Sequence, residues 1–238
     1  MSGLPYDLME ERPEHAPMGL IVLSTDETLE LEFRGVLSGS AVPLYVSRIA
    51  SAAEVSTDAL AGMETRLAAA AALLPNTQSY PVIGYGCTSA SAVIGSNRVE
   101  EIVSSVCDVG IVTNPLRAAI AQAEAADVSK FALLSPYVEE VNVPLREAFT
   151  KAGLSTDVFG TFAEPSEAKV ARISEQSIYD AATRLGADKS VDAIFISCTN
   201  LRTFGVLKEI RETLGKPVFS SNQSLCWHMQ TNQKGIFP

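Results

Sequence analysis

One sequence pattern occurs twice in this chain: an apolar stretch that ends in cysteine and threonine. The first copy covers residues 80–88, YPVIGYGCT, and the second covers residues 191–199, VDAIFISCT. A short apolar run bounded by small or polar residues is typical of a buried strand, so each cysteine is expected at the carboxyl end of a strand. About 110 residues separate Cys87 from Cys198, and a similar interval separates the strands that open the two halves. The repeat therefore favours a duplicated fold.

Strands and helices alternate along the whole chain, in the same order in both halves. We expect strands at 19–24, 42–49, 80–87 and 109–113, and again at 131–135, 158–162, 191–197 and 216–222. Helices are expected at 28–37, 57–74, 99–106, 116–126, 138–152, 174–185, 201–214 and 223–230. Cap residues support these bounds, since Asn114 and Pro115 open one helix and Gly39 and Gly153 follow two others. Ordinary α/β alternation without duplication is the alternative interpretation.

Alternating strands and helices predict parallel sheets of the α/β class, with ligands at the carboxyl ends of the strands. We expect two pseudo-symmetric halves, each a four-stranded parallel sheet flanked by helices. The first half would comprise 18–114 plus 218–238, and the second 115–217, after an N-terminal tail at 1–17. Short links favour an exchange in which 223–230 packs on the first half and 116–126 on the second. The two cysteine sulfurs should then face one another across a cleft with room for a small molecule.

The composition indicates a globular chain with an acidic surface. Of the 238 residues, 47% are hydrophobic, and the formal net charge is −10 with a pI near 4.7. Nucleic acids and anionic membranes need clustered Lys and Arg, so neither is expected as a partner, whereas a few local donors would hold a small anionic substrate. Neither a signal peptide nor a membrane-length apolar run is evident, which predicts a cytoplasmic protein. Four cysteines without metal-type spacing and only two histidines predict no metal site.

The paired cysteines indicate proton-transfer chemistry. Moving a proton on and off a carbon beside a carboxylate needs a base on one face and an acid on the other, and two thiols can supply both. A helix start after each cysteine would lower the thiol pKa and favour the thiolate. The alternative is that Cys87 and Cys198 are small buried hydrophobic residues. Polar residues beside them are expected to hold the substrate carboxylate and the charge that develops on it: Thr88, Ser89, Thr199 and Asn200.

Three further residues are less closely tied to this chemistry. Cys107 lies at an expected helix-to-strand turn and Cys226 inside an apolar helix, and neither has a match in the other half, so both are expected to be packing residues. Arg202, four residues after Cys198, could bind a carboxylate in bidentate fashion or be a solvated residue.

Several segments together resemble the aspartate/glutamate racemase superfamily. They are the two strand-Cys-Thr elements, the opening strand at 19–24, the turn at 135–137 and the late segment at 220–223. The chain is most similar to the branch that holds maleate cis–trans isomerase, arylmalonate decarboxylase and ectoine-utilisation protein A, and closest to the last. The resemblance covers about residues 18–230. It implies two flavodoxin-like halves, an active site in the cleft between them, and chemistry without a cofactor.

The same resemblance assigns site residues. Cys87 and Cys198 match the two catalytic cysteines of the superfamily. Tyr137 matches a tyrosine that contacts the substrate carboxylate in the isomerase branch, although a residue that follows proline at a strand end could also simply cap the core.

Two positions depart from the maleate isomerase pattern, which has asparagine after the first and sixth strands. This chain has Asp26 at the first position and, in our alignment, Glu167 at the second, with Glu164 and Ser166 as neighbouring alternatives. Both acidic residues could be plain helix caps. Lining a cleft, they would repel a dicarboxylate such as maleate, and amino-acid racemases of the superfamily carry acidic residues at comparable places.

The leading hypothesis is a cofactor-independent two-cysteine isomerase or racemase that acts by proton transfer on a small carboxylic acid bearing an amine, with the catabolism of ectoine-type compounds as its setting. Maleate-type cis–trans isomerisation is the first alternative, with one cysteine as nucleophile and the other as acid. A decarboxylase of the arylmalonate type fits less well, because that member keeps only the cysteine of the second half. A non-enzymatic carboxylate-binding protein is the last alternative. We also expect a homo-oligomer, a dimer or a tetramer.

Overall fold

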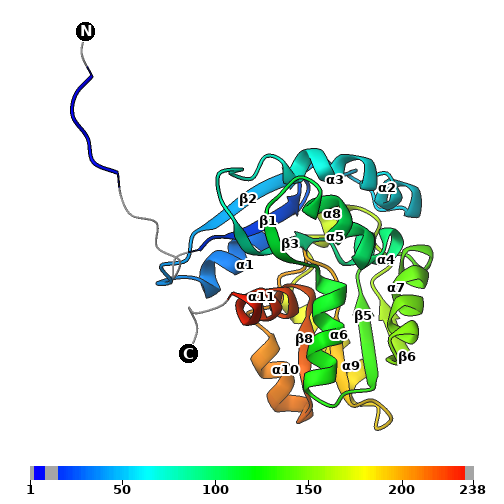
Figure 1. Cartoon of the computed structure of the whole chain (residues 1–238). Coiled ribbons are helices and arrows are strands. Elements are labelled where there is room, and N and C mark those ends of the chain that lie inside the picture. The colour runs from blue at the N-terminus through cyan, green and yellow to red at the C-terminus, as the bar shows by residue number, and fades with distance from the viewer. Residues whose placement is uncertain (1–2, 9–15, 234–238) are drawn as a thin grey trace.

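Two four-stranded sheets form the framework of the protein, and every strand pairing within them is parallel (Figure 1). The computed structural model describes residues 3–8 and 16–233. The first sheet has the order β2-β1-β3-β4 and the second β6-β5-β7-β8, so one topology occurs twice and the predicted duplicated α/β fold is confirmed. The strands are β1 (Met18–Leu23), β2 (Leu44–Ile49), β3 (Tyr80–Gly86), β4 (Val109–Thr113), β5 (Lys130–Ser135), β6 (Ser155–Thr161), β7 (Ala193–Ile196) and β8 (Val218–Ser220).

Helices flank both sheets, and several begin and end where local chemistry predicts. The Asn114 side chain accepts the N–H of Arg117 at 2.9 Å, which satisfies one free donor of the helix start. Beyond two helix ends, Gly39 and Gly153 have φ values of +84° and +82°, a conformation that favours glycine. The helices are α1 (Leu29–Val36), α2 (Thr57–Ala61), α3 (Glu64–Ala71), α4 (Thr88–Ile94), α5 (Ser96–Ser104), α6 (Pro115–Ala125), α7 (Glu139–Lys151), α8 (Glu167–Val170), α9 (Glu175–Gly186), α10 (Leu207–Leu214) and α11 (Ser221–Asn232).

The last helix of each repeat packs on the sheet of the other repeat. From α11, Leu225 and Met229 are buried in one cluster with Leu20 of β1 and Phe33 of α1. From α6, apolar residues are buried with an aromatic group of the second half, in a cluster that includes Leu116, Ala119, Ala123, Phe131, Phe149 and Phe195. The exchange expected from the short links is therefore present, and it joins the halves through their cores.

Strand β8 requires one correction to the expected division of the chain. Residues 218–220 pair with β7 in the second sheet, whereas the sequence analysis assigned 218–238 to the first half. The backbone groups of a strand are satisfied by its neighbours in the sheet, so β8 belongs to the second half, and within 218–233 only α11 packs on the first half. The other boundaries of the division, a tail at 1–17 followed by halves at 18–114 and 115–217, stay a proposal.

The helix expected at 201–214 is shorter than predicted. Helix α10 begins at Leu207, and residues 197–206 form an irregular segment after β7. The N–H groups of Thr203 and Phe204 donate to the carboxylate of Glu32 on α1, at 2.8 and 3.1 Å. Cys198 has a φ of +115°, outside the helical and extended regions that residues with a side chain ordinarily adopt. Contacts with the first half therefore override the helical pattern of this segment.

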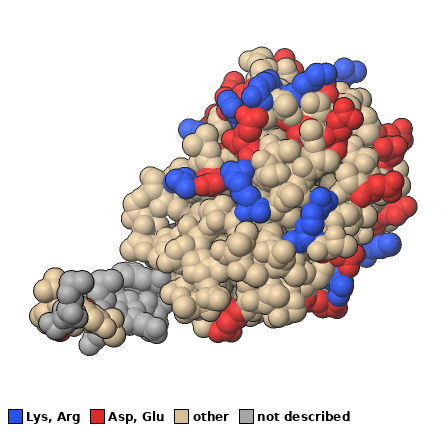
Figure 2. Space-filling model, turned by 90° about the horizontal axis from the view of Figure 1, so that it is seen from above, with Lys and Arg blue, Asp and Glu red and all other residues tan. Residues whose placement is uncertain are grey.

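The surface agrees with the acidic composition. On the face shown in Figure 2, acidic and basic side chains are interspersed, without the continuous basic surface that nucleic acids require. None of the helices in the described part of the chain is long and apolar enough to cross a membrane.

Candidate functional site

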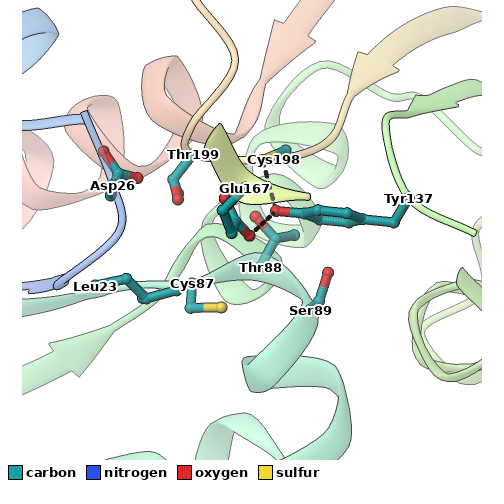
Figure 3. Close-up of a pocket in the computed structure, with 9 residues that line it drawn as sticks. All are labelled: Leu23, Asp26, Cys87, Thr88, Ser89, Tyr137, Glu167, Cys198 and Thr199. Atoms are coloured by element: carbon teal, nitrogen blue, oxygen red, sulfur yellow. Dashed lines mark hydrogen bonds between the residues drawn. The ribbon is translucent and has the colours of Figure 1, made fainter. Parts of the chain in front are cut away.

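Eight of the nine predicted site residues line one pocket at the carboxyl ends of the strands (Figure 3). Asp26 follows β1, Cys87 follows β3, Tyr137 follows β5 and Cys198 follows β7, while Glu167 opens α8. Parallel strands of two sheets with the same topology thus bring together residues that lie far apart in the sequence. The pocket is lined by Leu23, Asp26, Cys87, Thr88, Ser89, Tyr137, Glu167, Cys198 and Thr199. The ninth predicted residue, Asn200, is not part of this lining, but its side chain donates a hydrogen bond to the carboxylate of Glu167, which does line the pocket.

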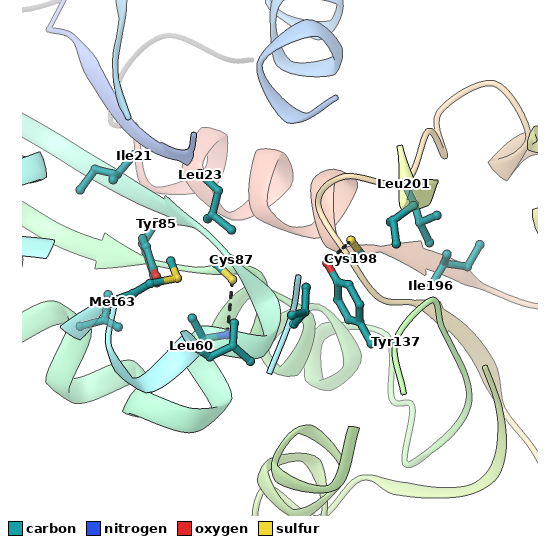
Figure 4. Packing of buried hydrophobic residues seen from close by; sticks show 14 of the residues in the cluster. Ile21, Leu23, Leu60, Met63, Tyr85, Cys87, Tyr137, Ile196, Cys198 and Leu201 are labelled. Carbon is teal, nitrogen blue, oxygen red and sulfur yellow. Dashed lines mark hydrogen bonds between the residues drawn. The ribbon is translucent and has the colours of Figure 1, made fainter. Parts of the chain in front are cut away.

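The pocket between the two cysteines is small. Its volume of about 10 Å³ is enough for roughly one water molecule and not for an organic acid. The expected room for a small molecule is therefore missing from this arrangement, because the side chains of both halves close around the thiols. Figure 4 shows the two cysteines from opposite halves within one buried cluster. A substrate would enter only after the lining segments move apart.

Cys87 occupies the predicted position at a helix start, yet its thiol is not acidic. It is the N-cap residue of α4, and its Sγ accepts the N–H of Ala90 at 3.4 Å. Burial raises the pKa of the Cys87 thiol to about 12, the Ala90 N–H opposes this rise, and the carboxylates of Glu167 and Asp26 add to it. The expected lowering of this pKa is wrong, because the loss of solvation outweighs the local donors.

Cys198 lies in a different backbone setting, on the irregular segment after β7. Its N–H donates to Oγ of Ser221 at 2.9 Å, and its Sγ accepts the N–H of Asn200 at 3.2 Å. Burial, followed by the charge of Glu167, raises the pKa of the Cys198 thiol well above its ordinary value, while Tyr137 and Asn200 lower it. The helix start predicted for this cysteine is absent, and here too the expectation of a lowered pKa is wrong.

A chain of hydrogen bonds links Cys198 to a buried carboxylate. The Tyr137 hydroxyl donates to Oε1 of Glu167 at 2.7 Å and lies 3.0 Å from Sγ of Cys198. A tyrosine has a single hydroxyl proton, so Tyr137 accepts from the Cys198 thiol in this arrangement. Burial raises the pKa of Glu167, with Asp26 adding to the rise, and the bonds from Tyr137 and Asn200 oppose it. The proton of Cys198 can therefore reach Glu167 through one intervening hydroxyl.

Asp26 has one satisfied and one unsatisfied carboxylate oxygen. Its Oδ1 accepts the N–H groups of Thr28 and Leu29, both at 2.8 Å, which is the capping role that the sequence left open. Its Oδ2 is buried without a hydrogen-bond partner although it belongs to a residue that lines the pocket. Burial raises the pKa of Asp26, and the backbone N–H groups of Leu29 and Thr28, followed by the Thr199 side chain and the charge of Arg48, oppose the rise. A group that donates a hydrogen bond into the pocket would satisfy Oδ2.

Asn200 fastens the second half to the first. Its side chain accepts the N–H of Glu27 at 2.8 Å and donates to Oε2 of Glu167 at 2.8 Å. Its carbonyl accepts the hydroxyl of Thr28 at 3.0 Å. Asn200 therefore orients Glu167 and the loop after β1 together, and its predicted contact with the substrate stays a prediction.

A family model for arylmalonate decarboxylase matches residues 40–234, which is most of the chain. The chain belongs to the arylmalonate decarboxylase family. No curated protein sequence matches it significantly. The predicted resemblance to the superfamily branch that holds this family is confirmed, whereas special closeness to ectoine-utilisation protein A stays a prediction.

Solved structures show the same fold at low sequence identity. A cysteine-to-serine mutant of Nocardia farcinica maleate cis–trans isomerase with a covalently bound succinylcysteine intermediate has a TM-score of 0.81 and 22% identity, over 91% of this chain and 92% of that chain. The maleate isomerase Iso from Pseudomonas putida S16 has a TM-score of 0.78 and 20% identity, over 91% and 92%. A mutant of arylmalonate decarboxylase with one cysteine introduced and one replaced by serine has a TM-score of 0.81 and 19% identity, over 94% and 96%.

Several residues in or near the pocket were not singled out from the sequence, or were placed differently. Leu23 lines the pocket, and Glu32 holds the segment after Cys198, yet an apolar strand residue and a helix glutamate carry no sequence signal for these roles. Arg202 is exposed and does not line the pocket. Three residues were considered for the position after the sixth strand: Glu164, Ser166 and Glu167. Glu167 is the one that lines the pocket, whereas the carboxylate of Glu164 lies 3.4 Å from Nζ of Lys169.

The other two cysteines, Cys107 and Cys226, do not line the pocket. Cys226 is buried in the core cluster of the first half, and Cys107 is half-buried, with its thiol donating to the carbonyl of Ala71. Within residues 3–8 and 16–233, no group of three or more His, Cys, Asp or Glu side chains is placed to hold a metal ion.

The unsatisfied carboxylate of Asp26 predicts a stability effect with a defined pH dependence. A carboxyl whose pKa is higher in the folded chain stabilises the fold below its ordinary pKa of 3.8, and this contribution is lost as the pH rises through the folded value. The asparagine in Asp26→Asn has no proton to lose, so the substitution removes this pH-dependent contribution. We expect its free energy of unfolding, relative to wild type, to rise by on the order of 1 kcal/mol between pH 4.5 and pH 8 in urea titrations.

Glu27→Gln is the matched control for this measurement. Glu27 is the neighbouring residue, but it is exposed and paired with Arg172 at 3.0 Å, which lowers its pKa. For Glu27→Gln, the free energy of unfolding relative to wild type should therefore fall, not rise, as the pH increases. A stability difference for Asp26→Asn that does not vary with pH would contradict the conclusion that burial disfavours the charged form of Asp26.

Proposed function

We propose that this protein is a cofactor-independent isomerase or racemase that moves a proton between the two faces of a carbon beside a carboxylate, in a small acid that bears an amine. One observation carries the proposal: two thiols and a buried carboxylate oxygen without a partner share one pocket, and none of the residues that line it is Lys, Arg or His. Family membership supports chemistry on a small carboxylic acid.

The proposed reaction begins with a thiolate at Cys198. Its thiol proton passes to the Tyr137 oxygen while Tyr137 passes its own proton to Oε1 of Glu167, which leaves a thiolate and a carboxylic acid and no change in the net charge of the pocket. The thiolate takes the proton from the substrate carbon. The thiol of Cys87 then delivers its proton to the opposite face of the same carbon. This leaves Cys87 as a thiolate, Cys198 as a thiol and Glu167 protonated, and the reverse reaction starts from that state with Cys87 as the base.

The substrate carboxylate needs donors that carry no full positive charge in this pocket. The hydroxyl groups of Thr88, Ser89 and Thr199 are the proposed side-chain donors in the lining. Thr88 Oγ1 lies 2.7 Å from Oγ of Ser221 and Thr199 donates to the carbonyl of Gly86 at 3.3 Å, so both hydroxyls would turn from these partners toward the substrate. Hydrogen bonds from such fixed groups gain strength in a closed site of low dielectric constant. They can therefore hold the carboxylate and stabilise the charge that develops when the neighbouring carbon loses its proton.

The proposal that the substrate bears an amine rests on two acidic side chains of the pocket, Asp26 and Glu167. An ammonium or amine group donates hydrogen bonds and carries positive charge, so it would satisfy Oδ2 of Asp26 and offset the repulsion between Asp26 and Glu167. A second carboxylate at the same place would add repulsion instead. Acids released during the catabolism of ectoine-type compounds are within this chemical class.

Maleate cis–trans isomerisation is the second candidate function. Two structural neighbours are described as maleate isomerases, and one of them holds a covalently bound succinylcysteine intermediate. The same pair of thiols could act with one as nucleophile and the other as acid. Decarboxylation of arylmalonates is supported by the family match alone, and non-enzymatic carboxylate binding remains the last proposal.

Solvent exchange measured by NMR in deuterium oxide tests these candidates. A panel of small acids with and without amines, together with maleate and phenylmalonate, would be incubated with the full chain. We expect deuterium to enter beside the carboxylate of an amino-bearing acid, with no loss of maleate absorbance and no release of carbon dioxide. Exchange in none of the acids would contradict the isomerase proposal, and consumption of maleate or phenylmalonate would replace it with the corresponding alternative. Sedimentation of the same sample would test the proposed homo-oligomer.

A further inference from the structure

The segment that carries Cys198 is anchored by a carboxylate from the other half of the molecule. Glu32 lies on α1, and its Oε1 accepts the N–H groups of Thr203 at 2.8 Å and Phe204 at 3.1 Å. Its Oε2 accepts Nδ2 of Asn222 at 2.7 Å, from the first turn of α11. Glu32 does not line the pocket, and the proposed reaction makes no use of it.

These contacts extend to both sides of Cys198. The Nδ2 group of Asn222 that binds Glu32 also donates to the carbonyl of Thr199 at 2.9 Å. On the preceding side, the N–H of Cys198 donates to Oγ of Ser221 at 2.9 Å. The first residues of α11 thus hold the backbone around Cys198, and Glu32 joins them to α1.

The backbone at Cys198 needs such support. Its φ of +115° is a conformation that residues with a side chain rarely adopt. Strained conformations of this kind persist where surrounding contacts over-determine them, and they are common at functional sites. A carboxylate that accepts two consecutive N–H groups makes charge-assisted hydrogen bonds, which are stronger than neutral ones.

We propose that Glu32 is a positioning residue that holds the segment from Cys198 to Phe204 against α1 and so fixes the placement of the Cys198 sulfur relative to Cys87. The catalytic part of this statement rests on the proposed function, because two thiols must reach opposite faces of one carbon. Displacing a reacting group by about 1 Å can cost about 100-fold in rate. The structural part, that Glu32 closes this segment, stands without any substrate.

Thiol alkylation and hydrogen exchange test the structural part. The full chain would be treated with iodoacetamide, and modification of each cysteine would be followed by mass spectrometry in wild type, Glu32→Gln and Glu32→Ala. In Glu32→Ala we expect alkylation of Cys198 to rise at least about tenfold and amide exchange at 199–206 to accelerate, because the segment opens more often. Alkylation of Cys87 and Cys107 should stay within about twofold of wild type.

Glu32→Gln should give an intermediate result. The amide oxygen can still accept from Thr203 and Phe204, but the amide nitrogen would face Nδ2 of Asn222, donor against donor. Asn222 has a buried Oδ1 without a partner, so its amide can turn to accept this nitrogen at the cost of its bond to Thr199. This variant also carries the comparison if Glu32→Ala fails to fold.

Glu30→Gln is the matched control, since Glu30 lies on the same helix but pairs with Arg34 and Arg48. It should leave Cys198 alkylation unchanged. Unchanged Cys198 reactivity in both Glu32 variants would overturn the proposal. An equal rise at Cys87 and Cys198 would overturn it too, because it indicates that the whole structure has loosened.

Steady-state kinetics test the catalytic part once a substrate acid has been identified. Glu32→Gln should then lower kcat about tenfold and leave KM within about twofold. If no acid turns over, the proposed function fails while the alkylation result still decides the role of Glu32.

Discussion

Replacing Cys198 with alanine is expected to abolish both inversion and solvent exchange at the substrate carbon, whereas Cys87→Ala should abolish inversion and keep exchange. The loss of inversion should reach about 1,000-fold in each variant, within the range typical of removed acid–base groups. NMR in deuterium oxide with each enantiomer of an active acid, combined with chiral separation, measures both properties. Circular dichroism would establish that the variants are folded.

The difference between the two variants follows from the surroundings of the thiols. Sγ of Cys198 lies 3.0 Å from the hydroxyl of Tyr137, which passes a proton on to Glu167. Sγ of Cys87 accepts the N–H of Ala90, which cannot take up a proton. Cys198 is therefore the thiol that can lose its proton to another side chain of the closed pocket before the substrate reacts. Without Cys87, the carbon would regain a proton from Cys198 on the face that lost it.

Cys107→Ala is the control for this prediction, because Cys107 is half-buried outside the pocket lining. Its activity should stay within about twofold of wild type. If instead Cys198→Ala keeps solvent exchange and Cys87→Ala loses it, the roles of the two thiols are the reverse of those proposed. If both single variants keep inversion, the two-thiol reaction itself is wrong.

Neutralising the two carboxyl groups should change which acids bind. A contact between like charges at about 4 Å, with an effective dielectric constant near 20, costs on the order of 4 kcal/mol, which corresponds to roughly 100-fold to 1,000-fold in affinity. In Asp26→Asn with Glu167→Gln, we expect amino-bearing acids to bind at least about 100-fold more weakly. Dicarboxylates such as maleate should bind correspondingly better. Isothermal titration calorimetry of both ligand classes, in wild type and the double variant, measures the change.

The control for charge is again Glu27→Gln, in which the substituted carboxyl is exposed and paired with Arg172. It removes one negative charge next to Asp26 and should leave both affinities nearly unchanged. Tight binding and isomerisation of maleate by the wild type, with no gain in the double variant, would contradict the electrostatic argument. The maleate isomerase alternative would then replace the proposed function.

The sequence by itself determined the duplicated architecture. The apolar runs that end at Cys87 and Cys198 predict buried strands because the hydrophobic pattern is local, and their spacing predicts the repeat. The parallel sheets, the exchange of α6 and α11, and the pocket at the strand ends follow from general rules of connection and topology. Cys87, Thr88, Ser89, Cys198 and Thr199 were predictable in the pocket lining for the same reason, since each follows a predicted strand, whereas Asp26, Tyr137 and Glu167 came from the family resemblance.

Only the tertiary structure decided the chemistry at the two thiols. Cys198 precedes an irregular segment rather than a helix because Glu32, distant in the sequence, binds the N–H groups of Thr203 and Phe204. Both thiols have raised pKa values because burial by the other half removes solvation, which no local pattern records. The hydrogen-bond chain from Cys198 through Tyr137 to Glu167 likewise joins three separate segments. Such contacts depend on how the two halves close on each other, and the order of residues along the chain does not specify that closure.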